Sequence, residues 1–465
     1  EELPFMMPRE GASAIRPGQL FHGLLLRRDG KGAIVEAVYR SERDALRLDG
    51  DLAVGRPSPD FGELLAAEVV RSWDDITVDA RVSAYGRAPA FGLRSVVVAP
   101  FRVSAVWYVL VFGSFLPTAR AFGPQDQAYV EGHLEIKGPI ADALRAAEGL
   151  SRNFGEGKRG KLPTLLRRHS KQRDAAAIHY HYDVSNDFYA LWLDRNMVYS
   201  CAYFKTGDED INTAQEQKLD HICRKLRLTA GDKLLDLGCG WGALVRWAAK
   251  YYGVDATGIT LSQNQHALAS ERIKADGLSD RCRVLLQDYR DVPGEGVYDK
   301  ISSIGMFEHV GLKNLPLYFG IVRRLLKEGG IVLNHGITSV DPDSRTVGLG
   351  GGDFVERYVF PHGELPHASL ALREMAAAGL EVMDIETLRL HYAKTLWHWS
   401  DRLEANLERA REYAGEKRLR IWRAYLAGCA YGFEQRWVSI HQMLAVKTDK
   451  PTSNPLPWSR DWMYR

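Results

Sequence analysis

Paired cysteines, long apolar runs and an excess of one charge are all missing from this sequence. Its five cysteines are scattered without a C-x-x-C pair, which argues against a disulfide framework or a zinc finger and favours free thiols in a reducing cytosol. The most apolar run, Ala105–Leu116, is shorter than the roughly 20 residues that span a bilayer. The first residues lack the charged and apolar regions of a signal peptide. The 61 Lys and Arg balance the 59 Asp and Glu, so bulk charge does not favour a nucleic-acid partner.

The composition predicts three successive parts. We expect a smaller β-rich N-terminal domain over residues 1–150, a linker over 151–174 and a catalytic domain over 175–465. Basic residues crowd residues 150–173, where Glu156 is the single acid. The linker is therefore either a solvated connector or a basic patch that holds the protein on an anionic membrane surface, where each Lys or Arg contributes ~1 kcal/mol.

The N-terminal part shows the alternation that is typical of strands. A helix is predicted over 62–73, and strands over Ile76–Ala84, Ser95–Val98 and Val103–Phe112. The apolar run Ala105–Leu116 is most simply a core strand, and a lipid-contacting surface is the alternative.

A glycine-rich turn organises the catalytic part. Lys233–Leu237 is typical of a buried strand, and the helical spacing of Ala243–Tyr251 follows the turn. Strand, tight turn and helix begin an α/β nucleotide site. A dinucleotide fingerprint would be G-x-G-x-x-G with an acid about 20 residues on. This chain has G-x-G-x-G preceded by Asp236, and its next strand, Val254–Ile259, has no acid at its end, which favours S-adenosylmethionine (SAM) over NAD.

Strands and helices alternate beyond this turn. The pattern predicts helices at Ser262–Ala275 and Leu315–Leu326, and strands at Arg283–Gln287, Tyr298–Ile304 and Gly330–Asn334. Such alternation is typical of an α/β, Rossmann-like domain with a mostly parallel sheet, whose ligands bind at the carboxyl ends of the strands.

The remaining segments are assigned less distinctly. Gly329 and Gly330 are expected to close the helix before the last of these strands. Further on we expect a helix over 366–378, a strand over Leu380–Leu388 and mainly helical structure over 392–446.

Seven ordered motifs carry a family resemblance. They are His179-Tyr-His-Tyr-Asp-Val-Ser-Asn-Asp-Phe-Tyr189, Tyr199-Ser-Cys-Ala-Tyr-Phe204, Asp236-Leu-Gly-Cys-Gly-Trp-Gly242, Gly258-Ile-Thr-Leu-Ser-Gln-Asn-Gln265, Met306-Phe-Glu-His-Val-Gly311, Asn334-His-Gly-Ile337 and His391-Tyr-Ala-Lys-Thr-Leu396. Over roughly residues 120–465 the chain resembles the cyclopropane-fatty-acyl-phospholipid synthase family, which includes the mycolic acid cyclopropane synthases. The resemblance implies a SAM-dependent methyltransferase domain behind a lipid-binding domain.

The family's chemistry sets physical demands. SAM donates a methyl group to the cis double bond of an acyl chain in a phospholipid, bound bicarbonate removes a proton, and the ring closes. Attack of the double bond on the methyl group leaves a carbocation on the acyl chain. Water would quench this carbocation, so the site must be dry. A base must stand beside the new methyl group. Nearby anionic charge and aromatic faces would stabilise both the sulfonium of SAM and the carbocation.

The resemblance implies a bicarbonate site formed by Cys201, Glu308, His335, Ile337 and Tyr392. Glu308 would orient the anion together with His335, and Tyr392 would donate its hydroxyl. Cys201 and Ile337 would contribute through backbone groups. A carboxylate beside bicarbonate is repulsive unless donors or a shared proton intervene.

The resemblance also implies how SAM is held. Glycines would admit the cofactor to the backbone, the end of the second strand would hold the ribose and amino-acid end, an aromatic and an arginine would lie against the adenine, and two residues would close over the methionyl part. Asp236 precedes the glycines, which are Gly238, Gly240 and Gly242. The ribose and the amino-acid end would be held by Thr260, Leu261, Ser262 and Gln265. The adenine would lie against Tyr289 and Arg290, and the methionyl part would be closed over by Tyr199 and Ser200.

Two further features remain open. Cys429 matches a cysteine sometimes assigned a catalytic role in the family, but its apolar, helical surroundings favour a packed thiol. His179 and His181 would share a face of a strand, yet no third ligand follows at a suitable spacing, so a metal site is not expected. With Asn186 and Asp187 they are expected to close the acyl pocket.

Three alternatives are kept. Loss of a different proton would give a methylene-branched chain, which a partner reductase could saturate. A small-molecule N- or O-methyltransferase would need no acyl channel, and a non-catalytic lipid-binding scaffold would not need the glycines. We expect a homodimer, by resemblance, located in the cytoplasm on the inner face of the membrane.

Overall fold

The computed structural model of the chain divides into two compact units, Glu1–Pro163 and Thr164–Arg465. The residues whose structure is described are 2–3, 21–29, 32–38, 71–73, 95–103, 106–114, 129–130, 136, 140–141, 185–343, 354–355, 358–359, 364–449 and 454–464. The basic linker and the pair His179 and His181 lie outside them. No described helix is both long enough and apolar enough to span a membrane.

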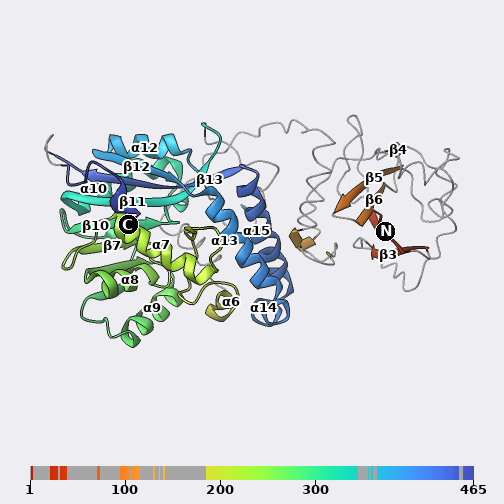
Figure 1. Ribbon diagram of the computed structural model, residues 1–465, viewed down its shortest axis with the longest axis horizontal. Helices are drawn as coiled ribbons and strands as arrows, with labels where there is room; N and C mark the ends of the chain where they lie inside the picture. The colour runs from red at the N-terminus through yellow and green to blue at the C-terminus, as the bar shows by residue number, and fades with distance from the viewer. Residues whose placement is uncertain are drawn as a thin grey trace. The chain divides into compact units, whose positions relative to one another are not determined.

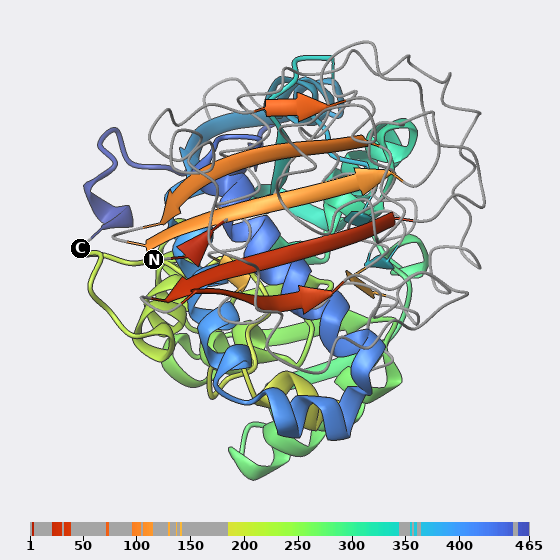
Figure 2. The same ribbon diagram turned by 90° about the vertical axis from the view of Figure 1, so that its right-hand side faces the viewer.

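An antiparallel sheet makes up most of the described part of the first unit (Figure 2, red and orange strands). Its strands are β1 (Glu2–Leu3), β2 (Phe21–Asp29), β3 (Gly32–Val38), β4 (Arg71–Trp73), β5 (Ser95–Val103) and β6 (Val106–Ser114). They follow the order β1-β2-β6-β5-β4, with β3 also paired to β2. The strands predicted at Ser95–Val98 and Val103–Phe112 are confirmed as β5 and β6.

The helix predicted over residues 62–73 is wrong at its C-terminal end. Residues 71–73 were expected to finish a helix, but they pair with Val96–Val98 of β5. Pairing with a neighbouring strand outweighs the local helical spacing. The rest of that helix and the strand predicted at Ile76–Ala84 lie outside the described residues.

The second unit is built on a seven-stranded sheet of order β12-β13-β11-β10-β7-β8-β9 (Figure 1). The strands are β7 (Lys233–Leu237), β8 (Asp255–Thr260), β9 (Cys282–Leu286), β10 (Tyr298–Ile304), β11 (Leu326–Ser339), β12 (Leu380–Thr387) and β13 (Val438–Lys447). The strands from β11 to β9 are parallel, and β13 runs antiparallel to both β11 and β12. The sheet is mostly parallel, as predicted.

Helices cover both faces of this sheet. On one face pack α7 (Ile211–Lys225), α8 (Ala243–Tyr252) and α9 (Gln263–Ala275); on the other pack α10 (Leu315–Leu325) and α12 (Ala368–Ala377). The helices α13 (Arg389–Glu404), α14 (Leu407–Ala414) and α15 (Glu416–Glu434) follow, and α13 lies against α15 (Figure 1). A short helix, α6 (Asn186–Ala190), precedes them all in this unit.

Two predictions for the second unit are corrected. The stretch 392–446 is helical only as far as Glu434, since Val438–Lys447 is a strand buried along nearly its whole length. A short apolar run of this kind does not distinguish strand from helix. Gly329 and Gly330 do not close a helix, because α10 ends at Leu325 and the glycines lie inside β11. They form an irregularity there: two residues of β10 span the same length as five of β11.

The alternation of β11 decides which side chains face which layer. Leu333 belongs to the core under α7 and α8, and Val332 to the core under α10. His335 and Ile337 therefore face the α7 layer, since side chains two apart share a face of a strand. Gly336 faces the α10 layer, where an added Cβ would stand 2.0 Å from the Phe307 ring. This close approach requires glycine at 336.

Candidate active site

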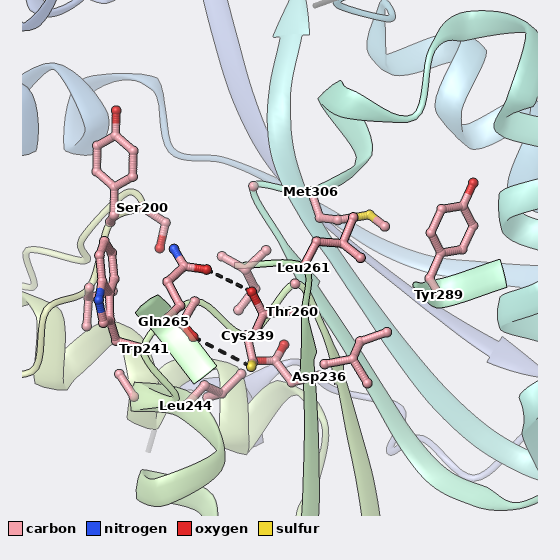
Figure 3. Close-up of a pocket in the computed structure, with 18 of the residues that line it drawn as sticks. Ser200, Asp236, Cys239, Trp241, Leu244, Thr260, Leu261, Gln265, Tyr289 and Met306 are labelled. Atoms are coloured by element: carbon pink, nitrogen blue, oxygen red, sulfur yellow. Dashed lines mark hydrogen bonds between the residues drawn. The ribbon is translucent and has the colours of Figure 1, made fainter. Parts of the chain in front are cut away.

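A pocket opens at the carboxyl ends of β7, β8 and β10 (Figure 3). Most residues that the sequence assigns to SAM line it. They are Tyr199, Ser200, Asp236, Gly238, Gly240, Thr260, Leu261, Gln265, Tyr289 and Arg290. Segments far apart in the chain thus meet at the sheet edge where the α/β pattern places a ligand.

Gly242 and Ser262 were expected in the same site, but they are not among the lining residues. Gly242 begins α8 with φ +77°, and an added Cβ would stand 3.1 Å from the Ala269 Cβ. The Ser262 hydroxyl caps α9 by accepting a hydrogen bond from the Gln265 amide at 3.3 Å. Both residues shape the turns that carry lining residues.

The glycine turn is fixed to β8. The amides of Gly238 and Cys239 both donate to the Ile259 carbonyl, at 3.1 and 2.9 Å. Gly240 has φ +53°, and a Cβ built on it would meet no atom within 4 Å. Since Gly240 lines the pocket, its bare backbone faces the space that a ligand would fill.

An amide and a hydroxyl occupy the end of β8, where a dinucleotide fold would carry an acid. The Thr260 hydroxyl donates to Gln265 Oε1 at 2.8 Å (Figure 3). Gln265 is thereby held with its amide oxygen engaged, which leaves its amide hydrogens as donors. This arrangement fits the neutral hydroxyls of a ribose.

Asp288 is a lining residue that the sequence analysis missed, although it lies in the same motif as Tyr289 and Arg290. Its carboxylate accepts from the Arg290 amide at 2.9 Å, from Arg290 Nε at 2.9 Å and from the far guanidinium nitrogen at 2.7 Å. The guanidinium is thereby held over the Tyr289 ring, 5.3 Å from its centroid. The three side chains form one rigid corner of the pocket.

Other lining residues had no sequence signal or a weak one. Trp241, Met306 and His309 fall inside quoted motifs, and their presence there was the available signal. The indole N–H of Trp241 donates to Asn186 Oδ1 at 2.8 Å, which places Asn186 beside the pocket. Lys218 belongs to no motif, and nothing in its helical pattern sets it apart.

Glu308 lies in a 3₁₀ turn between two lining residues, Met306 and His309. Its Oε1 accepts from the Ile337 amide at 2.7 Å, whereas Oε2 is buried without a partner among the described residues. Burial raises the pKa of Glu308 to about 7, and the Ile337 hydrogen bond offsets only part of that rise. The carboxyl group is therefore poised to hold or share a proton near neutral pH.

Tyr392, Cys201 and Cys429 gather near Glu308. Burial raises the pKa of Tyr392 well above its usual value, and the neighbouring ionisable groups of Tyr425, Cys201, Cys429 and Glu308 add to that rise. Tyr392 remains a neutral donor, and its hydroxyl forms no hydrogen bond with the described part of the chain. Burial likewise raises the pKa of the Cys201 thiol, and that of Cys429 to about 12, so neither is a thiolate.

His335 stands on the α7 face of β11. The side-chain amide of Gln442 donates to its Nδ1 at 3.2 Å, so the proton is assigned to Nε2, which is buried without a partner among the described residues. Burial, then the charges of Lys218 and Lys225, lower the pKa of His335 well below its usual value. Within the described chain no hydrogen bond joins His335 to Glu308, so the two approach the site separately.

The raised pKa of Glu308 makes stability depend on pH. The folded protein keeps this proton between pH 4.5 and about 7, where the unfolded chain releases it, so stability falls as pH rises through that window. Glu308→Gln keeps an acceptor for Ile337 and has no charge to bury. We expect wild type to lose about 3 kcal/mol more than Glu308→Gln across this window, measured by urea unfolding. Parallel pH profiles of the two proteins would contradict the assigned pKa.

An aromatic wall, defined by Tyr189, Trp192, Tyr199, Trp399 and Trp422, borders the pocket at Tyr199. The rings of Trp192 and Trp399 stand 5.5 and 5.4 Å from that of Tyr199, and both indoles are fully buried. Tyr392 joins the wall through Trp399, at 6.1 Å. The wall places buried, packed rings behind Tyr199, and aromatic ring faces attract cations.

Comparison with known proteins decides the family. Residues 169–443 match the sequence profile of the mycolic acid cyclopropane synthetase family. The chain belongs to this family.

Individual relatives agree with the family assignment. The chain is 54% identical over 338 residues to a protein of Pseudomonas putida named "Probable fatty acid methyltransferase", covering 73% of this chain and 86% of the relative. It is 38% identical over 283 residues to the cyclopropane-fatty-acyl-phospholipid synthase of Escherichia coli K12, covering 60% and 70%. Mycolic acid cyclopropane synthase CmaA1, solved with SAH and CTAB, is 34% identical with a TM-score of 0.56, covering 61% and 99%. This cyclopropane synthetase family member is a SAM-dependent methyltransferase, and methylene transfer to lipid chains is the chemistry its relatives support.

Proposed function

We propose that the protein transfers a methylene unit from SAM to the cis double bond of an unsaturated acyl chain in a membrane phospholipid, giving a cyclopropane ring. The observation that carries this proposal is a buried carboxyl group, Glu308, with a free oxygen and a pKa of about 7, in a turn whose neighbours line the cofactor pocket. Attack by a carbon–carbon double bond leaves a carbocation on the acyl chain, and a buried carboxyl group near the aromatic wall suits the anion that must take a proton from it.

The lining residues would hold the cofactor. The aromatic wall would protect the carbocation that forms when the double bond attacks the methyl group. SAM, when bound, supplies an electrophilic methyl group on a sulfonium. Gly240 and Gly238 let it approach the backbone, while Thr260 and Gln265 fix the ribose. The aromatic wall keeps water from a positively charged acyl chain and stabilises that charge through its ring faces.

The residues around Glu308 fit a bound bicarbonate ion. Oε2 of Glu308 and Nε2 of His335 are buried without partners in the described structure, and the Tyr392 hydroxyl is unengaged there. A protonated Glu308 can donate to the anion, which removes the repulsion that two negative charges would cause. Tyr392 and His335 would supply neutral donors, and the anion would accept the proton that leaves the new methyl group.

A second product is favoured by the relative from Pseudomonas putida, which is named as a fatty acid methyltransferase and covers most of this chain. The same methyl transfer, followed by a hydride shift from the methylated carbon to the neighbouring cationic carbon and loss of a proton from the methyl group, would give a methylene-branched acyl chain. A reductase partner would then saturate it to a methyl branch.

Membrane docking completes the proposal. The β-rich first unit and the basic residues between 150 and 173 would hold the protein on the anionic inner face of a membrane, from the cytoplasm, and the working form would be a homodimer. Binding to anionic vesicles that weakens with added salt supports docking, and equal binding to neutral vesicles contradicts it.

Product analysis tests the proposal. Purified protein is incubated with SAM and dioleoyl phospholipid vesicles, with and without bicarbonate, and the acyl chains are analysed by mass spectrometry before and after ozonolysis. We expect a product that gains one methylene unit, resists ozonolysis and needs bicarbonate. An ozonolysis-sensitive product supports the branched alternative. Methylation of soluble amines with untouched vesicles would contradict both lipid products.

A further inference from the structure

Two lysines of α7 are buried where charged groups are rarely left without a partner. Lys218 is 1% exposed and Lys225 is 0% exposed, and they lie seven residues apart on one face of the helix. Lys225 is compensated by two carboxylates, Glu386 at 2.5 Å and Asp384 at 3.6 Å. Lys218 differs from it in both its partners and its surroundings.

Lys218 forms no ion pair within the described chain. Its Nζ donates to the neutral hydroxyl of Ser200 at 2.8 Å, and Asp194, Cys201 and Asp236 act on it only at longer range. Burial lowers the pKa of the Lys218 ammonium to about 8, so it carries its charge at neutral pH. A buried cation without a counter-ion is costly, and an arriving anion would remove that cost.

Lys218 and its partner both line the cofactor pocket. Asp236, on the same pocket wall as the glycine turn, supplies a buried carboxylate whose Oδ1 accepts from the Ser302 hydroxyl at 2.7 Å. The pocket thus presents one buried ammonium and one buried carboxylate. The methionyl end of SAM carries the complementary pair, a carboxylate and an ammonium.

The segment that carries Ser200 is fixed to α7 before any ligand arrives. The side-chain amide of Gln215, one turn before Lys218, donates to the Ser200 carbonyl at 2.8 Å and also approaches the Val198 carbonyl at 3.4 Å. The backbone and the hydroxyl of this segment are therefore positioned by the same helix. Such preorganisation lowers the entropic cost of binding.

We propose that Lys218, together with the Ser200 hydroxyl, binds the ionised carboxylate of the methionyl chain of SAM and so selects amino-acid-bearing cofactors. This inference rests on the assignment of the pocket to SAM and is independent of which lipid product forms.

Calorimetry with SAM and decarboxylated SAM tests the proposal, since the two ligands differ only in the carboxylate. We expect wild type to prefer SAM, and Lys218→Met to lose about 10- to 100-fold in SAM affinity while its affinity for decarboxylated SAM is nearly unchanged. Equal losses for both ligands, or an unchanged preference, would overturn the role of Lys218. Failure of wild type to bind SAM would instead overturn the pocket assignment.

Lys225→Met is the matched control, because it removes a buried lysine of the same helix that is already paired. Its preference for SAM should equal that of wild type, even where stability is lost. If Lys218→Met does not fold, Ser200→Ala applies the same comparison, and a several-fold smaller preference for SAM is expected. An unchanged preference in Ser200→Ala would overturn the shared role of the two residues.

Discussion

Glu308→Ala is expected to lower turnover on phospholipid vesicles by about 100-fold or more while SAM affinity stays near the wild-type value. Glu308 is not among the residues that line the cofactor pocket; its Oε1 accepts from the Ile337 amide, and its Oε2 is buried without a partner in the described structure. Removing the carboxyl group takes away a hydrogen-bond partner of the bicarbonate that acts as the base. The residues that line the cofactor pocket are unchanged. Turnover is followed by labelled methyl incorporation, and affinity by calorimetry.

Asp299→Ala is the matched control for this variant. Asp299 also accepts a backbone amide hydrogen bond, from Lys233 at 2.9 Å, but it lies at the opposite end of β10. Its loss should affect stability and leave turnover close to wild type. If Glu308→Ala kept turnover within a few-fold of wild type, the assignment of Glu308 to the base site would be withdrawn.

Gly240→Val is expected to abolish measurable SAM binding. Gly240 has φ +53°, which side chains with a branched Cβ rarely adopt, and the added methyl groups would project into the open space of the pocket. Strain and occlusion therefore act together. Calorimetry on the folded variant, with circular dichroism to establish folding, measures the effect.

Gly277→Val separates strain from occlusion. Gly277 has φ +69° and no atom within 4 Å of an added Cβ, but it follows α9 away from the lining residues. It should carry a similar backbone penalty and bind SAM normally. Normal SAM affinity in Gly240→Val would contradict the place of the glycine turn in the cofactor site.

The regular α/β core was predictable because periodicity and turn chemistry agree there. Lys233–Leu237, the glycine turn and the helix after it form as expected, since each carries its own local signal. Val438–Lys447 was missed because its burial comes from lying between β11 and β12, a fact about the assembled sheet. Local pattern does not carry such tertiary information.

The same division holds for the site. Motif residues such as Asp236 and Gly240 were found because their spacing has a physical reason that is legible in the sequence. Lys218 was missed because a lysine in an amphipathic helix is usually solvated, and only its burial beside Ser200 sets it apart. The roles assigned to Glu308 and Tyr392 came from a family resemblance, and their roles in binding the anion stay predictions.

One labelling measurement tests the central claim most directly. SAM with a fully deuterated methyl group is supplied with dioleoyl phospholipid vesicles, and the mass of the acyl product is measured by mass spectrometry. The account predicts that the transferred carbon loses one deuterium, because the base beside Glu308 takes its proton from the new methyl group. A product that retains every deuterium of the transferred methyl group, or label found only outside the acyl chain, would contradict it.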